Sequence, residues 1–164
     1  VWTSLDAGLR PVEVERATVD WVDLDRGRLV IPKDDAAKTD GEGRVWTPVL
    51  TDRTVEGLQR WLEQRACYDR YEGCDELWLT KYGNPYDSGN LAHLARELCS
   101  IADIDTTNRD VSWYSIRRGM ITELIDASDL STAAEQARHS DIRSTRRYDQ
   151  APEHRRRDAL EQIE

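Results

Sequence analysis

The spacing of apolar residues limits what this chain can fold into more than any other feature. Three segments, residues 51–67, 91–102 and 112–127, repeat apolar residues every three or four positions, which is the period of a helix with one buried face. Two short runs, residues 28–32 and 44–50, are rich in β-branched and apolar residues and flank a polar loop with two glycines, so they predict a hairpin. We therefore expect an α+β domain that is mainly helical and carries a small antiparallel β-sheet or hairpin.

Shorter helices are expected around these segments. Residues 1–9 are interpreted as the end of a helix that closes at Gly8, because glycine readily adopts the left-handed conformation that follows a helix. Pro11 suits a first helical turn, and apolar residues interleaved with Glu13 and other charged residues predict a short helix with Arg10 at its N-terminal side. Further short helices are predicted at residues 133–138, 141–148 and 153–163.

The length of 164 residues suits one domain, and no repeat, low-complexity segment or linker divides it, so we treat residues 1–164 as one unit. The chain enters a helix-like segment directly from a valine, and we expect it to be a piece of a longer protein. It has no apolar run of about 18 residues and no charged-then-apolar leader. Its three cysteines form no C-x-x-C pair and no metal-ligand spacing. These features predict a cytoplasmic protein without a membrane span.

The charge of the chain is unevenly distributed. The net charge is -9, yet residues 138–157 hold seven arginines against three acids. Because affinity for a phosphate backbone depends on basic groups that release counterions, this cluster keeps DNA binding open despite the overall sign. Only three of the 23 basic residues are lysine and phenylalanine is absent. We interpret that pattern as adaptation to high salt, which screens the repulsion between surface charges; the alternative is an ordinary acidic cytosolic protein.

Residues 110–149 carry the side chains that suit chemistry on a phosphate. Tyr148 is the candidate nucleophile, but a phenol loses its proton only near pKa ~10. Its attack would therefore need cations nearby, and Arg117 and His139 are the candidates. Arg117 falls in the first turns of the helix predicted at residues 112–127, where free N–H groups favour an anion and a guanidinium can hold two phosphate oxygens.

These residues resemble the motifs of the tyrosine recombinase (phage integrase) family. Residues 138–148, Arg-His-Ser-Asp-Ile-Arg-Ser-Thr-Arg-Arg-Tyr, resemble the closing motif of that family, which places a histidine or tryptophan nine residues before the nucleophilic tyrosine. Tyr-Ser-Ile-Arg-Arg at residues 114–118 resembles its His-x-x-Arg box, and residues 8–14 resemble the box with its first catalytic arginine. The three boxes occur in the order of the family and span nearly the whole chain.

The resemblance implies the catalytic domain of a site-specific DNA recombinase, with an N-terminal DNA-binding domain missing from this sequence. Tyr148 would attack a phosphodiester to give a 3′-phosphotyrosyl DNA, with Arg10 and Arg117 on the non-bridging oxygens and His139 hydrogen-bonded to the same phosphate. Lys38, in the hairpin loop, would protonate the leaving 5′ oxygen, and Lys33 is a poorer match for that role. The expected partners are double-stranded DNA and further copies of the chain in a tetramer, with no metal or cofactor.

One position departs from the pattern of the family. Tyr114 stands where the family usually has histidine or lysine; a phenol can donate a hydrogen bond to a phosphate but is a poor base near neutral pH. The departure leaves open a catalytically degenerate DNA-binding homologue. A type IB topoisomerase-like strand transferase and a metal-dependent nuclease at Asp34 and Asp35 are further alternatives.

Individual residues also have plainer interpretations. Arg10 could belong to a surface ion pair, Arg117 could be a structural arginine, and Lys38 could be a solvated loop residue. The segment at residues 153–163 packs either on its own domain or, as the family resemblance implies, into a neighbouring copy.

Overall fold

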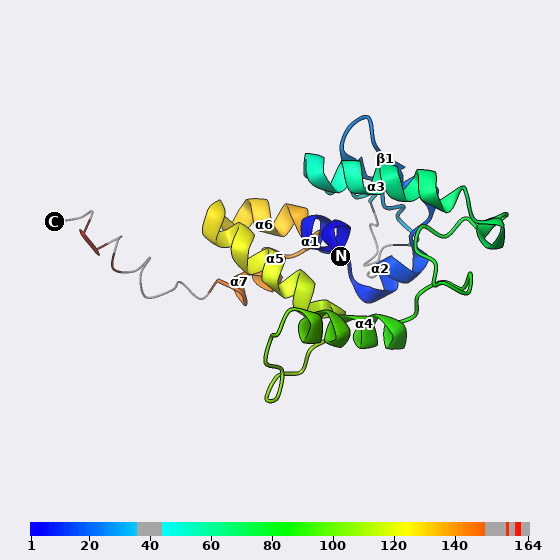
Figure 1. Ribbon diagram of the computed structural model, residues 1–164. Helices are drawn as coiled ribbons and strands as arrows, with labels where there is room; N and C mark the ends of the chain where they lie inside the picture. Colours follow the sequence, from blue (N-terminus) through cyan, green and yellow to red (C-terminus); the bar gives the residue numbers. More distant parts are fainter. Residues whose placement is uncertain (36–43, 150–156, 158–159, 162–164) are drawn as a thin grey trace.

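The computed structural model describes residues 1–35, 44–149, 157, 160 and 161 of the chain. It is mainly helical with a small antiparallel sheet, as predicted (Figure 1). Its helices are α1 (Trp2–Ala7), α2 (Pro11–Arg16), α3 (Asp52–Arg65), α4 (Ser88–Ile101), α5 (Trp113–Ala127), α6 (Leu130–Gln136) and α7 (Ile142–Arg146). Single 3-10 turns occur at Val19–Trp21 and Asp69–Tyr71. Among the helices of the described ranges, none is long and apolar enough to cross a membrane.

The sheet differs in part from the predicted hairpin. Its two strands are β1 (Val22–Asp23) and β2 (Arg28–Leu29), which pair antiparallel around a turn that contains Gly27 at φ 57°. The predicted partner of β2 does lie beside it, but only through isolated bridges such as Ile31 with Trp46. Strand β1 was missed because two residues after a 3-10 turn show no periodic pattern. Residues 36–43 of the predicted loop lie outside the described residues.

Capping residues explain where the helices start. The long helices and the turn at Gly8, with φ 55°, agree with the predictions. Helix α6 begins three residues earlier than predicted, because the side chain of Asp129 accepts hydrogen bonds from the first-turn amides of Ser131 and Thr132. Helix α7 is shorter than predicted, and Asp141 caps it through the amide of Arg143.

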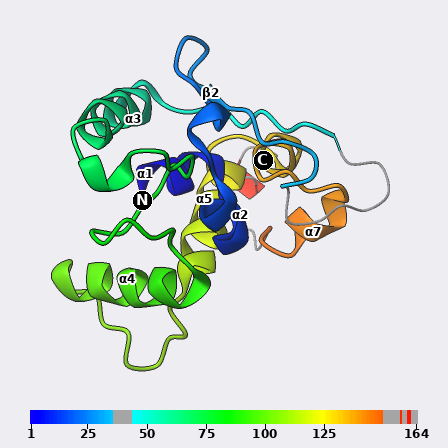
Figure 2. The same cartoon turned by 90° about the vertical axis from the view of Figure 1, so that its right-hand side faces the viewer.

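Helix α5 joins the two apolar clusters of the molecule. It packs against α1, α4 and α6, and Figure 1 shows it running between α4 and α6. Trp113 belongs to the cluster that includes the sheet, α3 and α4, whereas Ile121 and Ile125 belong to the cluster with α6. Arg117 therefore lies on the buried side of α5, between these two clusters. In the view of Figure 2, helices α3 and α4 lie on one side of α5 and α7 lies on the other.

A buried carboxylate joins the start of α2 to the segment after α6. Glu13, predicted only as one of the charged residues interleaved along this helix, is in fact fully buried. Its Oε2 accepts a hydrogen bond from the backbone N–H of Arg10 at 2.8 Å, and its Oε1 pairs with Nη1 of Arg10 at 2.7 Å. Nη2 of Arg138 donates to the same carboxylate. The turn from α1 into α2 is thereby fixed to a residue 125 positions further along the chain.

The charge of Glu13 should make the free energy of unfolding depend on pH. Burial alone raises the pKa of Glu13, but the charges of Arg138 and Arg10 and the hydrogen bonds from Arg10 hold that pKa below its ordinary value of 4.5. A carboxyl with a depressed folded-state pKa stabilises the fold above its unfolded-state pKa, and that contribution is lost as the pH falls through the folded value. Glu13→Gln should therefore lose roughly 3 kcal/mol at neutral pH.

Urea unfolding followed by circular dichroism between pH 3 and pH 7 measures this effect. The difference in unfolding free energy between wild type and Glu13→Gln should be largest near neutral pH and shrink below pH 4.5. Glu56→Gln, which removes an exposed carboxylate paired with Arg60 at 3.7 Å, is the matched control and should change stability by less than about 1 kcal/mol. A difference that stays constant with pH would contradict the assignment of charge to Glu13.

Candidate active site

The predicted site residues gather around one cavity. It has a volume of about 310 Å³ and is lined by Arg10, Trp46, Tyr114, Arg117, Arg138, His139, Ser140, Ser144, Arg147 and Tyr148. Five of the six residues singled out in the sequence are in this set, although they come from segments far apart in the chain. Lys38, the sixth, lies outside the described residues, and Lys33 is exposed in a turn and does not line the cavity.

Arg117 is a deeply buried cation of the cavity. It is 3% exposed, and its Nη1 donates to the carbonyl of Gly8 while Nη2 donates to the carbonyl of Ala137. It is thus anchored as a structural arginine would be, yet each Nη has a second N–H. Burial, and then the charges of Arg10 and Arg138, lower the pKa of Arg117 to about 9. The guanidinium stays protonated at neutral pH, in surroundings where an anion would stabilise it.

Arg10 is neither a surface ion pair nor an isolated cation. Its side chain is 12% exposed and pairs with a Glu13 carboxylate that is 0% exposed. As the N-cap of α2, Arg10 has an extended backbone with φ -75° and ψ 154°. The guanidinium borders the cavity while its partner lies beneath it, so the ion pair orients Arg10 and leaves part of it accessible.

The imidazole and the phenol of the closing motif lie next to each other. The ring centroids of His139 and Tyr148 are 6.4 Å apart and their planes differ by 18°. Nδ1 of His139 is 2.7 Å from Oγ1 of the fully buried Thr145. Helix α7, which carries Thr145, leads directly to the candidate nucleophile, whose backbone N–H bonds to the carbonyl of Thr145 at 2.9 Å. One short helix therefore sets the position of both rings.

Tyr114 is an exposed residue at the edge of the cavity. It lies in the first turn of α5 and is 44% exposed. Arg117, three residues further along the same helix, lines the same cavity, as the spacing of the two residues predicts. The phenol hydroxyl and the guanidinium can therefore address one ligand in this space.

Sequence reasoning missed three residues that shape the site. Glu13 carried a usable signal, since an acid three residues after a helix N-cap suits a capping box. Thr145 carried no such signal in the sequence, because its role depends on the contact between α7 and the ring of His139. Arg138 was seen only as part of a motif; in the structure its Nη1 donates to Ala7 and its Nη2 to Glu13.

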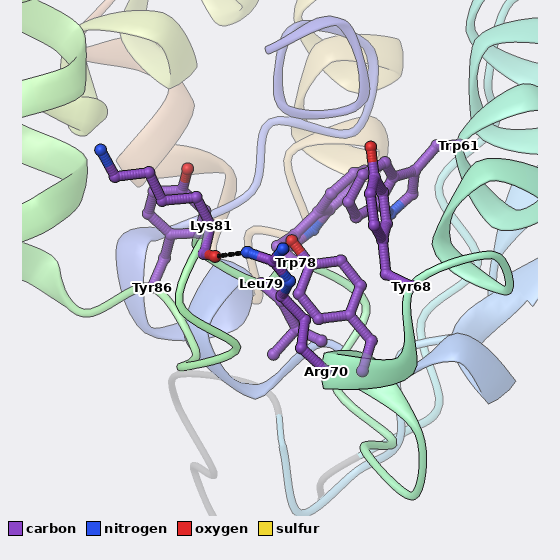
Figure 3. Close-up of a pocket in the computed structure, with 8 residues that line it drawn as sticks. Trp61, Tyr68, Arg70, Trp78, Leu79, Lys81 and Tyr86 are labelled. Atoms are coloured by element: carbon purple, nitrogen blue, oxygen red, sulfur yellow. Dashed lines mark hydrogen bonds between the residues drawn. The ribbon is translucent and has the colours of Figure 1, made fainter.

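A second hollow lies elsewhere on the surface and shares no lining residue with this cavity. Figure 3 shows it between α3 and the segment that follows, with aromatic rings on both sides of Arg70. Its volume is about 610 Å³. Nη1 of Arg70 donates to the carbonyl of Lys81, so this cation is bound to the backbone. The hollow gathers aromatic rings rather than paired cations, an imidazole and a phenol, and the cavity at Tyr148 remains the candidate active site.

The nuclease alternative rested on two adjacent acids. Within the ranges that the structure describes, Asp34 and Asp35 belong to no group of three or more potential metal ligands. Neither residue lines the cavity at Tyr148.

Solved recombinase structures share this fold. The XerA recombinase superposes with a TM-score of 0.77 at 18% identity, over 98% of this chain and 56% of that chain. The Tn1549 transposon integrase in complex with a circular intermediate DNA gives 0.71 at 18% identity, over 97% and 56% of the two chains. The XerH site-specific recombinase bound to palindromic difH substrate, a post-cleavage complex, gives 0.74 at 19% identity, over 96% and 42%. This chain thus spans less than two thirds of the length of each.

Among curated proteins, none matches this chain. The comparison with family models does give a match, because the model described as the phage integrase family covers residues 3–155. That range includes every residue of the cavity described above. The motifs, the fold and the family match agree, and the chain belongs to the phage integrase family.

Proposed function

We propose that residues 1–164 are the catalytic domain of a site-specific DNA recombinase that cleaves and rejoins double-stranded DNA through a 3′-phosphotyrosyl intermediate. The observation that carries this proposal is the meeting of Tyr148, His139, Arg10 and Arg117 around one cavity. A DNA-binding domain N-terminal to this segment belongs to the same proposal. The DNA-bound recombinases with the same fold support the choice of substrate.

In the proposed reaction the phenol of Tyr148 gives its proton to water, its oxygen attacks the scissile phosphorus and the bond to the 5′ oxygen breaks. Arg10 and Arg117 bind the non-bridging oxygens, and His139 donates a hydrogen bond to the same phosphate. Lys38 gives its proton to the departing 5′ oxygen. A 5′ hydroxyl from a partner duplex then gives its proton back to Lys38 and attacks the phosphotyrosine. The bond from phosphorus to Tyr148 breaks, the released phenolate takes a proton from water, and a phosphodiester is restored, so the bond energy is kept in the covalent intermediate.

The charges of the cavity support this chemistry. Arg10, Arg117 and Arg138 line the cavity, and the Glu13 carboxylate pairs with two of them. The cluster therefore carries excess positive charge before any substrate enters. Preorganised cations of this kind stabilise the charge that develops on a phosphorane and supply much of the rate in phosphoryl transfer.

Oligomerisation and setting are further proposals. We propose a tetramer on DNA, supported by an apolar cavity of about 730 Å³ bordered by α1, α5, α6 and residues 49–51, since exposed apolar surface of this kind marks interaction sites. A cytoplasmic location and adaptation to high salt stay predictions from composition.

The main rival function is that of a catalytically degenerate DNA-binding homologue, which is favoured only by Tyr114. A topoisomerase-like enzyme would give relaxed DNA without recombinant products.

Tyr148 should form a covalent bond with DNA without a divalent metal. On a nicked suicide DNA that carries the target site, wild type should accumulate an adduct that peptide mapping assigns to Tyr148. Tyr148→Phe should form none, because it lacks the nucleophilic oxygen. Tyr82→Phe, at a residue 75% exposed in a turn, is the matched control and should react normally. An adduct with Tyr148→Phe, or its loss in EDTA, would refute this mechanism.

Lys38 should act on the leaving group rather than on binding. A positioned general acid contributes about 10² to 10⁴ in rate, so Lys38→Ala should cleave slowly while its DNA affinity in a gel-shift assay stays near that of wild type. A 5′-thio leaving group needs no proton and should restore the rate. Lys33→Ala is the control; a defect there that the thio substrate rescues would transfer the role to Lys33.

Tyr114 should donate a hydrogen bond to the phosphate. Loss of a hydrogen bond to a charged group costs about 1.5 to 3 kcal/mol, so Tyr114→Phe should slow single-turnover cleavage about ten- to a hundredfold with DNA affinity retained. Tyr114→His should be active. Full activity of Tyr114→Phe would instead assign the ring to packing, and an inert wild type beside an active Tyr114→His would favour the degenerate homologue.

A further inference from the structure

Arg138 has a position that its sequence motif does not explain. It lies between α6 and His139, with φ 57° in the left-handed region that bulky residues rarely adopt. Its side chain is 1% exposed, although it ends in a guanidinium whose burial is costly unless it is paired. Both the backbone conformation and the burial must be offset by interactions nearby.

The guanidinium obtains these interactions from the opposite end of the chain. Its Nη1 donates to the carbonyl of Ala7, and its Nη2 lies 3.3 Å from the carbonyl of Gly8. These carbonyls are at the C-terminal end of α1, where backbone acceptors lack partners within the helix. Arg117 donates to the Gly8 carbonyl as well, so two cations share the end of one helix.

The ion pair of Arg138 with Glu13 connects it to Arg10. Oε2 of Glu13 accepts from Nη2 of Arg138 and from the backbone N–H of Arg10, while Oε1 pairs with the Arg10 side chain. An interaction that holds the Glu13 carboxylate in place therefore also holds the guanidinium of Arg10, which borders the cavity. On its other side Arg138 is bonded directly to His139, whose backbone N–H is held by the carbonyl of Ala134 at 2.9 Å.

We propose that Arg138 is a positioning residue for DNA cleavage, which holds Arg10 through Glu13 and His139 through the backbone. It acts through these neighbours, because its guanidinium donates to Glu13 and to the carbonyls at the end of α1. The inference rests on the proposed recombinase function. It assigns to Arg138 a task distinct from that of Arg10 and Arg117, which bind the phosphate.

The pH dependence of cleavage distinguishes this positioning role of Arg138 from a role in folding alone. The charged groups that face Glu13 are Arg10 on its own helix, Arg138, and Arg117 from α5. Burial raises the pKa of Glu13 and the charge of Arg138 is the first of the opposing causes. Without Arg138 the carboxyl should therefore take up a proton at higher pH and release the side chain of Arg10. The resulting defect in cleavage depends on pH, whereas a simple loss of folded protein affects cleavage in proportion at every pH.

Arg138→Gly is the informative variant, since glycine adopts φ 57° without strain. Single-turnover cleavage of the suicide DNA should slow about a hundredfold, as expected when reacting groups are misplaced, with gel-shift affinity within about threefold of wild type. The acidic limb of its pH–rate profile should move to higher pH. Arg138→Lys keeps the charge without the fork-shaped donor set and should recover part of the rate and keep the limb near its wild-type position. Arg60→Ala, an exposed arginine in α3, should behave as wild type.

The double variant Glu13→Gln/Arg138→Gly tests the coupling. Because the titrating carboxyl is absent, the shifted acidic limb should disappear, and the double variant should be slowed less than the product of the two single effects. Wild-type cleavage by Arg138→Gly would overturn the inference. So would a slowing that is equal at every pH and matches the unfolded fraction measured by circular dichroism.

A wild type that forms no adduct would refute the proposed function but would still leave the inference testable. Nuclear magnetic resonance of the Glu13 carboxyl and the His139 ring reports both connections without substrate. Arg138→Gly should raise the titration midpoint of Glu13 and shift the His139 ring signals, while Arg60→Ala should change neither. Unchanged signals in Arg138→Gly would overturn the positioning role of Arg138 independently of catalysis.

Discussion

The site of this protein depends on how one carboxylate offsets several cations. Arg10, Arg117 and Arg138 converge on a small and largely buried volume, where like charges repel more strongly than in solution. Glu13 lies among them and is fully buried, and the carbonyls of residues 7, 8 and 137 accept further hydrogen bonds from Arg117 and Arg138. The three cations thus outnumber the one carboxylate among them, and an anion bound in the cavity would reduce this excess of positive charge.

This cluster lies where the two apolar clusters meet. Trp113 anchors the start of α5 in one cluster and Ile121 anchors its middle in the other, so the second turn of α5 is held from both sides. The backbone that carries Arg117 is therefore fixed by packing on both sides. The hydrophobic effect supplies the rigidity, and the polar groups at the seam set the direction in which each arginine points. Packing and charge are therefore separate requirements, and the site needs both.

Much of this arrangement could be predicted from the sequence, for reasons that can be named. The long helices follow from apolar spacing, and Gly8 with Pro11 predicted the turn between α1 and α2. Local patterns did not predict strand β1 or the early start of α6, which depend on two paired residues and on an aspartate cap. The burial of Glu13 was missed because its partner Arg138 lies 125 positions away, and no period within a helix encodes such a contact. The role of Lys38 concerns residues outside the described ranges.

The short bond between His139 and Thr145 has a consequence for how the site is assembled. Thr145 lies on α7, three residues before Tyr148, so the helix that delivers the phenol also holds the imidazole through its Nδ1. A displacement of α7 would move Tyr148 and break the contact with Thr145 that orients the His139 ring. The orientation of the imidazole and the placement of the phenol therefore depend on the same short helix.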